Sequence, residues 1–397
     1  MIQINTPKYV RQILFGLQAR GHLAYLVGGC VRDMIMDITP QDWDICTSAL
    51  PEEILEIFPG SIPTGIKHGT VTVVIGTHSA EVTTFRTEGT YNDHRRPDSV
   101  TFVSDLISDL SRRDFTMNAI AISADGMVSD PYDGGRDIAN RTIRCVGEPK
   151  QRFSEDALRM FRALRFSARL GFNIDYNTLT AIESCAYLAA ELSPERVRDE
   201  IEKILMTARP ETLGAAINFG LLERYIPGAG WKTPNFADIT LLPRKALPRW
   251  AAFSIMLRKY GFIPHVNEFL DLLRLDGRSI RCCSDASDIL CSELPEDALG
   301  WKKLLNRYGV DTVSCAVMAN YAITGTDREK DLKAVLKSGE CFSLKHLAVS
   351  GDDLLSLGLR GPELGEMLNF LLEYVMEYPQ NNKREILIEL AKYSEES

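Results

Sequence analysis

The chain has 397 residues, of which 45% are hydrophobic and 25% are charged, and its formal net charge at pH 7 is −9. This composition is typical of a globular protein in water, and the length favours roughly two to four folding units. Because no apolar run approaches the roughly 20 residues of a membrane-spanning helix and the N-terminus lacks a signal-peptide pattern, we expect no membrane association. The negative charge disfavours indiscriminate nucleic-acid binding but permits a local basic surface.

The nine cysteines and six histidines are scattered along the chain. The sequence contains no Cys-x-x-Cys pair, and no histidine is followed by aspartate, which argues against a His-Asp metal phosphohydrolase. An odd number of dispersed cysteines in a chain of this size indicates reduced thiols and a cytoplasmic protein. The sequence also lacks Gly-x-x-x-x-Gly-Lys-Ser/Thr, which disfavours a helicase or a kinase.

The predicted elements begin with a helix over residues 6–20 and a short buried strand over residues 25–27. Gly28 and Gly29 follow the strand at once and precede a helical apolar spacing, so they occupy a strand-to-helix turn. A turn without side chains lets a ligand approach the backbone, and its amides favour an anionic group such as phosphate. Arg32 adds a positive charge close to this turn.

Two carboxylates, those of Asp42 and Asp44, come next and lead into a predicted strand. Alternate residues of a strand face the same way, so these side chains are expected to project together. Paired carboxylates suit a hard cation such as Mg²⁺, which proteins usually hold with one or two carboxylates and substrate phosphates. Beside a phosphate-binding turn, the pair indicates metal-assisted nucleotidyl transfer. Taken alone, the pattern also fits a solvated pair or a helix cap.

A hairpin is predicted from two β-branched stretches, residues 69–76 and 80–86. Glu81 belongs to the second stretch and would be a third carboxylate if it shared the face of Asp44. A strand-edge glutamate is the alternative explanation. Residues 87–99 then form a polar loop whose length indicates function or mobility.

Arg113 and Asp114 lie in a segment that is polar at its start and apolar towards residue 122. The fork of an arginine suits a triphosphate, and an aspartate suits a ribose hydroxyl, while a surface ion pair is the alternative. Residues 1–145 mix strands and helices, whereas the chain beyond residue 152 is nearly all helical. A mixed start followed by a run of helices predicts separate units.

Residues 154–170 predict one amphipathic helix that begins at a serine cap. Asp156, Arg159 and Arg162 share a stripe along one side of it, and Arg165 continues this stripe. A salt-bridged surface is one explanation, but the arginines outnumber the acid and would repel each other without an anionic partner. A carboxylate and a guanidinium one turn apart also present the groups that read the hydrogen-bonding edge of a base.

Together, these segments resemble the class II tRNA nucleotidyltransferases, the family of CCA-adding enzymes and bacterial poly(A) polymerases. The shared motifs follow in the family's order: Gly28-Gly29-x-Val31-Arg32-Asp33 with Asp42-x-Asp44, the run from Arg112 to Ala119, the run from Asp130 to Gly135, Glu155-Asp156-x-x-Arg159, and Ser193-x-Glu195-Arg196. They extend from residue 25 to about residue 205, and their shared order is far more specific than any one motif. Residues 347–383 resemble the tail of bacterial members less specifically.

The resemblance implies an α+β fold, with a polymerase-β-like nucleotidyltransferase head followed by an all-α neck, body and tail. The boundaries would be residues 1–145 for the head, 146–207 for the neck, 208–330 for the body and 331–397 for the tail. The head would carry out catalysis, and the neck would recognise the nucleotide base. The body and tail would bind tRNA by its phosphates and shape.

The family's residue roles carry over by position. Asp42 and Asp44 would be the catalytic residues and would hold two Mg²⁺ ions. The nucleotide would contact Gly28, Gly29, Arg32, Arg113, Asp114, Asp156, Arg159, Arg162 and Arg165. The first five of these would face the triphosphate and ribose. Asp156 and Arg159 would pair with the edge of C or A and reject G and U, and Arg162 and Arg165 would flank this base pocket.

The reaction implied by the resemblance is template-independent addition of CCA to the 3′ end of tRNA from CTP and ATP, with release of pyrophosphate. The partners would be the tRNA acceptor arm and the two nucleotides, and the sequence leaves the oligomeric state open. Residues 87–99 resemble the flexible loop that the family uses to switch from C to A. The alternatives are A-only addition, poly(A) synthesis and an inactive RNA-binding protein. The intact Asp42, Asp44 and Arg113 argue against the last of these.

Overall fold

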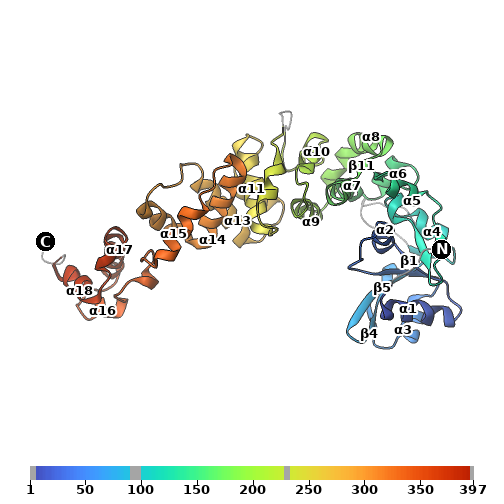
Figure 1. The fold of residues 1–397 in the computed structure, drawn as a ribbon, viewed down its shortest axis with the longest axis horizontal. Helices are drawn as coiled ribbons and strands as arrows, with labels where there is room; N and C mark the ends of the chain where they lie inside the picture. The colour runs from blue at the N-terminus through green and yellow to red at the C-terminus, as the bar shows by residue number, and fades with distance from the viewer. Residues whose placement is uncertain (1–5, 90–99, 228–232, 394–397) are drawn as a thin grey trace. The chain divides into compact units, whose positions relative to one another are not determined.

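The computed structural model describes residues 6–89, 100–227 and 233–393. The chain forms two compact units, Met1–Thr233 and Pro234–Ser397, drawn in Figure 1 from blue to yellow-green and from yellow to red. The division falls inside the segment that the resemblance assigns to the body. The finer boundaries between head, neck, body and tail stay a prediction.

The first unit is built on a seven-stranded mixed sheet of order β3-β4-β5-β2-β1-β8-β9. Its strands are β1 (Ala24–Val27), β2 (Asp44–Thr47), β3 (Ile62–Gly65), β4 (Thr70–Ile75), β5 (His78–Thr84), β8 (Ala121–Ser123) and β9 (Val128–Ser129). Neighbouring strands are antiparallel except β2 and β5, which run parallel. The predicted hairpin is confirmed as β4 and β5, and the mixed sheet agrees with the predicted head.

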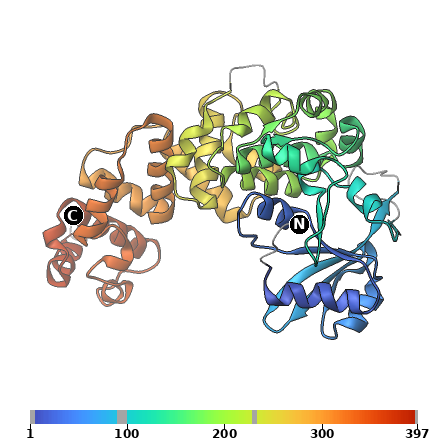
Figure 2. The same cartoon turned by 45° about the vertical axis from the view of Figure 1, so that its right-hand side comes forward.

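Two helices, α1 (Lys8–Ala19) and α3 (Pro51–Ile57), lie on one side of this sheet (Figures 1 and 2). The predicted first helix is confirmed, and the apolar stripe that α1 buries consists of Val10, Ile13, Leu14 and Leu17. At the start of α3, the Glu53 carboxylate accepts a hydrogen bond from the Leu50 amide at 2.7 Å. Local signals in the sequence therefore define both helices.

Smaller elements connect the sheet to a helical segment. Around the sheet they are α2 (Gly29–Ile35), β6 (Arg86–Glu88), β7 (Val100–Phe102), α4 (Leu106–Ser111), η2 (Thr116–Asn118), α5 (Gly134–Ala139) and β10 (Thr142–Ile143). The helical segment comprises α6 (Pro149–Glu155), α7 (Leu158–Leu170), β11 (Asn173–Ile174), α8 (Tyr176–Cys185), η3 (Ala186–Glu191), α9 (Pro194–Leu205) and α10 (Thr212–Asn218). Antiparallel pairing of β6 with β7 brings together the ends of the predicted polar loop, whose residues 90–99 lie outside the described residues.

The single helix predicted over residues 154–170 is wrong, because α6 ends at Glu155 and α7 begins at Leu158. Asp156, between them, has an extended backbone with φ −143° and ψ 103°. Its side chain accepts from the Leu158 amide at 3.1 Å, a local side-chain-to-backbone bond of the kind by which aspartate competes with a continuous helix. Ser154 is not the predicted cap, since it lies inside α6 and its hydroxyl donates to the Lys150 carbonyl at 2.9 Å.

The described residues of the second unit form helices joined by turns and loops, and they contain no strand. Its elements are η4 (Phe236–Leu241), α11 (Ala246–Lys259), α12 (Val266–Leu272), α13 (Gly277–Ile289), α14 (Ala298–Thr324), α15 (Glu329–Ser338), η5 (Leu344–His346), α16 (Gly351–Leu355), α17 (Pro362–Glu377), η6 (Pro379–Asn381) and α18 (Arg384–Tyr393). The last helices share an apolar core that includes Leu354, Leu371, Val375 and Leu387. The expectation of helices after the mixed head is thus confirmed, apart from the short β11.

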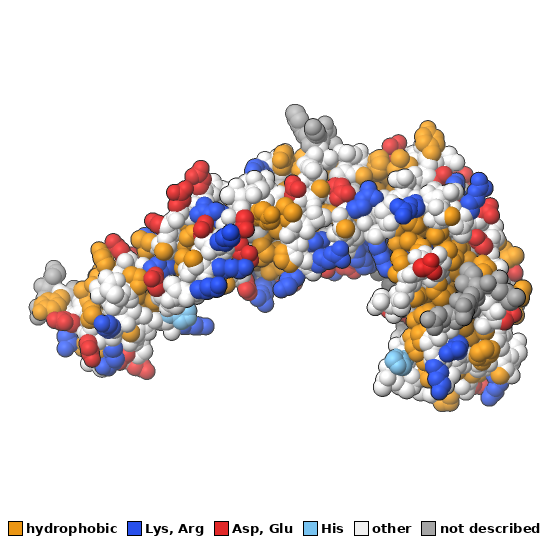
Figure 3. Space-filling model, in the orientation of Figure 1, with side chains coloured by type: hydrophobic (Ala, Val, Ile, Leu, Met, Phe, Trp, Pro, Cys, Tyr) orange, Lys and Arg blue, Asp and Glu red, His pale blue; other side chains and the backbone are white. Residues whose placement is uncertain are grey.

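Charged side chains of both signs cover the helical parts of the chain. Figure 3 shows Lys and Arg side chains grouped over these helices on one face, with Asp and Glu side chains among them. The net charge of −9 therefore coexists with local basic areas. Among the described helices, none has both the length and the apolar character needed to cross a membrane.

Candidate active site

The turn between β1 and α2 is shaped by Gly28, whose φ of 78° and ψ of −136° are disfavoured for a residue with a Cβ. A Cβ added at Gly28 would lie 3.4 Å from Arg113 Nη1 and 3.5 Å from Asp44 Oδ2. Gly29 follows as the first residue of α2. The glycine turn, the second aspartate of the pair and the Arg113 segment therefore meet at one point of the first unit.

Asp44 is the first residue of β2 and stands opposite Glu81 of β5 in the parallel register. Burial raises the pKa of the Asp44 carboxyl, the charges of Glu81 and Asp42 raise it further, and Arg113 opposes them. Asp42 lies in a bend before β2, so the predicted strand alternation does not explain its position. The charge of Asp42 nevertheless raises the pKa of Asp44, so the two carboxylates repel each other.

The two aspartates have the chemistry of a divalent-cation site, because their oxygens are hard donors and their charges repel each other without a cation. In the described parts of the chain, no three His, Cys, Asp or Glu side chains gather closely enough to hold a metal ion by themselves. An ion held by Asp42 and Asp44 would therefore take its further oxygen ligands from substrate phosphate and water.

Asp109 of α4 holds Arg113 beside the glycine turn. Its Oδ2 accepts from Arg113 Nη2 at 3.1 Å, and its Oδ1 accepts from Arg112 Nη2 at 2.7 Å. Burial raises the pKa of the fully buried Asp109, but the two guanidiniums lower it overall, so the carboxylate stays ionised. Asp109 was not predicted as a site residue. Its i, i+3 and i, i+4 spacing to two arginines was the available signal.

Arg113 and Arg32 differ in the donors that they retain for a phosphate. The Nε of Arg113 is buried and has no hydrogen-bond partner among the described residues. Arg32 is only 2% exposed, and its Nε and Nη2 donate to Asp33 Oδ1 at 2.9 and 2.6 Å. Its Nη1 donates to Asn118 Oδ1 at 2.9 Å. Arg32 is thus held by acceptors of the protein itself in this structure, and its contact with the nucleotide stays a prediction.

Asp114 binds a residue of α7, and its contact with the ribose stays a prediction. Its Oδ2 accepts from Arg162 Nε at 2.9 Å and from Arg162 Nη2 at 2.6 Å. Its Oδ1 accepts from Asn118 Nδ2 at 3.0 Å and from the Phe115 amide at 2.8 Å. Burial opposes ionisation, but Arg162 and Asn118 together lower the pKa of Asp114 to about 2. This carboxylate is therefore ionised at neutral pH and fixes α7 against the sheet domain.

The arginine stripe of α7 is neutralised by the protein's own carboxylates, which agrees with the salt-bridged alternative. The pairs are Arg159 Nη1 with Glu155 Oε2, Arg162 Nη2 with Asp114 Oδ2, and Arg165 Nε with Glu200 Oε2, each at 2.6 Å. Asp114 and Glu200 are distant in sequence, so a pattern within one helix could not reveal them, whereas Glu155 lies only four residues before Arg159.

Asp156 and Arg159 lie together at the start of α7, where the Arg159 amide donates to the Asp156 carbonyl at 3.0 Å. Arg196 of α9 pairs with Asp156, with 2.9 Å between Nη2 and Oδ2. Arg159 is 7% exposed and directs its Nη2 to the Arg112 carbonyl at 3.1 Å. Because α9 also carries Glu200, this helix supports the stripe residues of α7 from the side.

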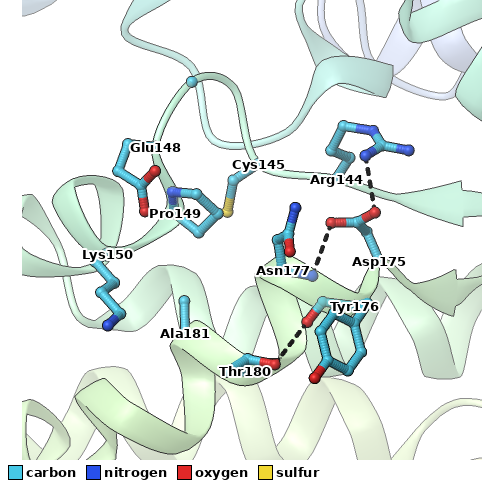
Figure 4. Close-up of a pocket in the computed structure, with 11 residues that line it drawn as sticks. Arg144, Cys145, Glu148, Pro149, Lys150, Asp175, Tyr176, Asn177, Thr180 and Ala181 are labelled. Atoms are coloured by element: carbon cyan, nitrogen blue, oxygen red, sulfur yellow. Dashed lines mark hydrogen bonds and ion pairs between the residues drawn. The ribbon is translucent and has the colours of Figure 1, made fainter.

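A separate pocket of about 420 Å³ lies between residues 144–150 and the start of α8 (Figure 4). Figure 4 shows Arg144 directed at Asp175, with 2.8 Å between Nη1 and Oδ1. None of the predicted site residues lines this pocket. It is therefore distinct from the point where Gly28, Asp44 and Arg113 meet.

Family models match two parts of the chain. Residues 24–144 match the "Poly A polymerase head domain", and residues 171–230 match the "Probable RNA and SrmB-binding site of polymerase A". Combined with the mixed sheet and with the glycine turn that adjoins Asp44, these matches define a nucleotidyltransferase with a poly(A) polymerase-type head.

Two relatives are similar over nearly the whole chain. The CCA-adding enzyme of Geobacillus sp. (strain WCH70) is 39% identical over 385 residues, which cover 94% of this chain and 93% of the relative. The CCA-adding enzyme of Limosilactobacillus fermentum is 38% identical over 389 residues, covering 96% and 95%. The crystal structure of the Bacillus stearothermophilus CCA-adding enzyme in complex with CTP has a TM-score of 0.82 at 33% identity, covering 98% of this chain and 97% of that chain. This chain belongs to the CCA-adding enzyme family.

Membership of this family implies the use of a divalent metal ion. The residues agree with that requirement, since Asp42 and Asp44 combine hard oxygen donors with a mutual repulsion that a cation would relieve.

Proposed function

We propose that this protein adds C, C and A in turn to the 3′ end of tRNA, using CTP and ATP without a nucleic-acid template. The observation that carries this proposal is the meeting of Gly28, Asp44 and Arg113 in a chain related to CCA-adding enzymes over nearly its whole length. In each step the tRNA 3′-oxygen forms a bond to the α-phosphorus of the nucleotide. The bond between the α- and β-phosphates breaks, and pyrophosphate leaves.

The catalytic carboxylates of this proposal are Asp42 and Asp44. They would hold Mg²⁺, which when bound lowers the pKa of the 3′-hydroxyl and stabilises the leaving pyrophosphate. Arg113 supports the triphosphate, because Asp109 holds its guanidinium beside the glycine turn and its Nη1 lies 3.4 Å from the position of a Gly28 Cβ. The absence of a Cβ at Gly28 lets a phosphate approach the backbone between Arg113 and Asp44.

The base is selected in this proposal by Asp156 and Arg159 at the start of α7. Cytosine and adenine both present an exocyclic amine beside a ring nitrogen that accepts a hydrogen bond. A carboxylate accepts from the amine and a guanidinium donates to the ring nitrogen, whereas G and U present the opposite order of donor and acceptor. Arg162 and Arg165 flank this pair, and Asp114 supports the ribose side through Arg162.

The tRNA acceptor arm would lie on the helices that follow the head, over the proposed neck (146–207), body (208–330) and tail (331–397). The grouped Lys and Arg side chains of Figure 3 support this assignment, since phosphate contacts depend on local basic areas. Nine unpaired cysteines, eight of them buried, agree with a reducing cytoplasm.

The variant Asp42→Ala distinguishes catalysis from simple RNA binding. With a tRNA transcript that lacks CCA, the wild type should extend the RNA and release pyrophosphate only when Mg²⁺ is present. Asp42→Ala should lose extension and keep RNA binding, measured by a gel-shift titration with the same transcript. Extension by Asp42→Ala at the wild-type rate would exclude Asp42 as a metal ligand. A wild type that binds but never extends would indicate an inactive RNA-binding protein.

A further inference from the structure

Phe166 of α7 is 5% exposed, and three guanidinium groups lie close to its ring. The Cζ atoms of Arg165, Arg32 and Arg162 lie 4.4, 5.3 and 5.5 Å from its ring centroid. A guanidinium within about 6 Å of a ring centroid is attracted by the negative face of the ring, and the attraction grows where water is excluded. The buried ring is therefore a shared surface for all three cations.

The three arginines come from two separate segments of the first unit. Arg32 belongs to α2, directly after the glycine turn, whereas Arg162 and Arg165 belong to α7. Each is neutralised by its own carboxylate, so charge balance does not require the ring. A carboxylate fixes one edge of a guanidinium, and a flat aromatic face restricts the orientation of its plane. The ring thus supplies an alignment that the ion pairs alone do not.

The ring also completes a closed chain of contacts. Arg32 Nη1 donates to Asn118 Oδ1 at 2.9 Å, and Asn118 Nδ2 donates to Asp114 Oδ1 at 3.0 Å. Asp114 Oδ2 then accepts from Arg162 Nη2 at 2.6 Å. Arg32 and Arg162 both return to Phe166, which joins the two ends of the polar chain. A shift of α7 relative to α2 would disturb both the polar chain and the two contacts at the ring.

We propose that Phe166 is a positioning residue for nucleotide selection, which aligns α7 with the glycine turn by holding Arg32 and Arg162 against one ring. The inference rests on the proposed function, in which α7 reads the base while the turn receives the triphosphate. The base at α7 and the triphosphate at the glycine turn are then held a fixed distance apart. A base that fails to pair at α7 leaves its α-phosphate out of place at Asp44.

The test removes the aromatic ring at position 166 and keeps an apolar side chain there. Phe166→Leu keeps an apolar side chain and loses the aromatic face, so KM for CTP and ATP should rise roughly tenfold while kcat changes less than about twofold. Incorporation of UTP and GTP should rise relative to CTP and ATP. Phe166→Tyr keeps the face and should restore both KM and selectivity. Wild-type KM and selectivity in Phe166→Leu, or equal defects in the two variants, would overturn the inference.

A general loss of packing is controlled by Phe161→Leu, which changes a fully buried ring of the same helix. Both leucine variants should lower the thermal midpoint, but only Phe166→Leu should change KM and selectivity. The same KM increase in Phe161→Leu would mean that the ring acts by packing alone. If Phe166→Leu does not fold, Phe166→Met offers a flexible apolar replacement for the same measurements.

A double-mutant cycle with Arg162→Lys tests whether the ring acts through Arg162. Lysine keeps the charge and loses the flat guanidinium, so its effect on KM should be smaller in the Phe166→Leu background than in the wild type. Additive effects would overturn the proposed coupling. A wild type that cannot extend tRNA would remove the proposed function and this inference together, whereas an active wild type with an unchanged Phe166→Leu would remove only the inference.

Discussion

Arg113 and Asp44 approach the same side of one residue. The Nη1 of Arg113 lies 3.4 Å and the Oδ2 of Asp44 lies 3.5 Å from the position that a Cβ of Gly28 would occupy. A cation suited to phosphate and a carboxylate suited to a metal ion are therefore held beside a backbone that no side chain covers. This relationship joins three segments that are distant in the sequence.

Gly28→Ala should abolish most of the extension activity, because its Cβ would enter the space between Arg113 and Asp44. The positive φ of 78° should also cost about 1–2 kcal/mol of stability in an alanine variant. Gly21→Ala is a matched control, since Gly21 has a φ of 83° and a Cβ there would meet nothing within 4 Å. Urea denaturation should show similar losses for both variants, and extension should fail only in Gly28→Ala. Equal activities would contradict the close approach.

Asp44→Asn should remove activity and stabilise the metal-free protein at neutral pH. Burial and the charges of Glu81 and Asp42 raise the pKa of Asp44, so its ionised form is disfavoured in the fold. The folded protein then binds this proton more tightly than the unfolded chain, and stability from this group is lost as pH rises through the raised pKa. The variant should therefore gain thermal stability above that pKa and behave like the wild type below the ordinary aspartate value.

Added Mg²⁺ gives the complementary measurement for Asp44. It should raise the thermal midpoint of the wild type, because a bound cation relieves the repulsion between Asp42 and Asp44. Asp44→Asn should show little response to the ion. An equal increase in both proteins would indicate that the ion binds elsewhere.

Asp114→Asn should destabilise the protein by about 2 kcal/mol at neutral pH, since the pKa of Asp114 is lowered to about 2 in the fold. A lowered carboxyl pKa contributes stability above the unfolded value near 4. That contribution is lost as pH falls from about 4 to about 2. Urea denaturation of both proteins from pH 6 to pH 2 should show two curves that converge at the acid end. Parallel curves would mean that the Arg162 pair does not control this ionisation.

Arg196→Met should relax base selection without stopping catalysis, because Arg196 fixes the Asp156 carboxylate by a bond of 2.9 Å. The ratio of CTP to UTP incorporation should fall roughly tenfold, as expected for the loss of one charged hydrogen bond. Arg198→Met is the control, because Arg198 pairs with Asp199 on the same helix at 2.9 Å. A control variant with the same loss of selectivity would show that α9 acts only through its overall charge.

Local rules made the sheet domain and its turn predictable. Two glycines directly after a short apolar strand indicate a tight turn. The spacing of Val10, Ile13, Leu14 and Leu17 is that of the buried face of a helix. Asp42 shows the limit of such rules, because the chain bends there and strand alternation does not apply.

Contacts between distant segments could not be predicted in the same way. The arginines of α7 looked unpaired in sequence because Asp114 and Glu200 reach them from other elements. Asp156 follows the end of α6 and binds the Leu158 amide, a local break that the continuous apolar pattern of residues 154–170 concealed. The predicted loop at 87–99 lies mostly outside the described residues, and its role in switching from C to A stays a prediction.

Primer extension on three tRNA transcripts tests the central claim most directly. The transcripts would end before CCA, after the first C and after the second C, and each would receive Mg²⁺ with CTP, ATP or both. CTP alone should extend the first two ends to CC, and both nucleotides together should complete CCA and then stop. Growth only from the CC end with ATP would instead make this an A-adding enzyme, and long A tails would make it a poly(A) polymerase. Either result would contradict complete CCA addition.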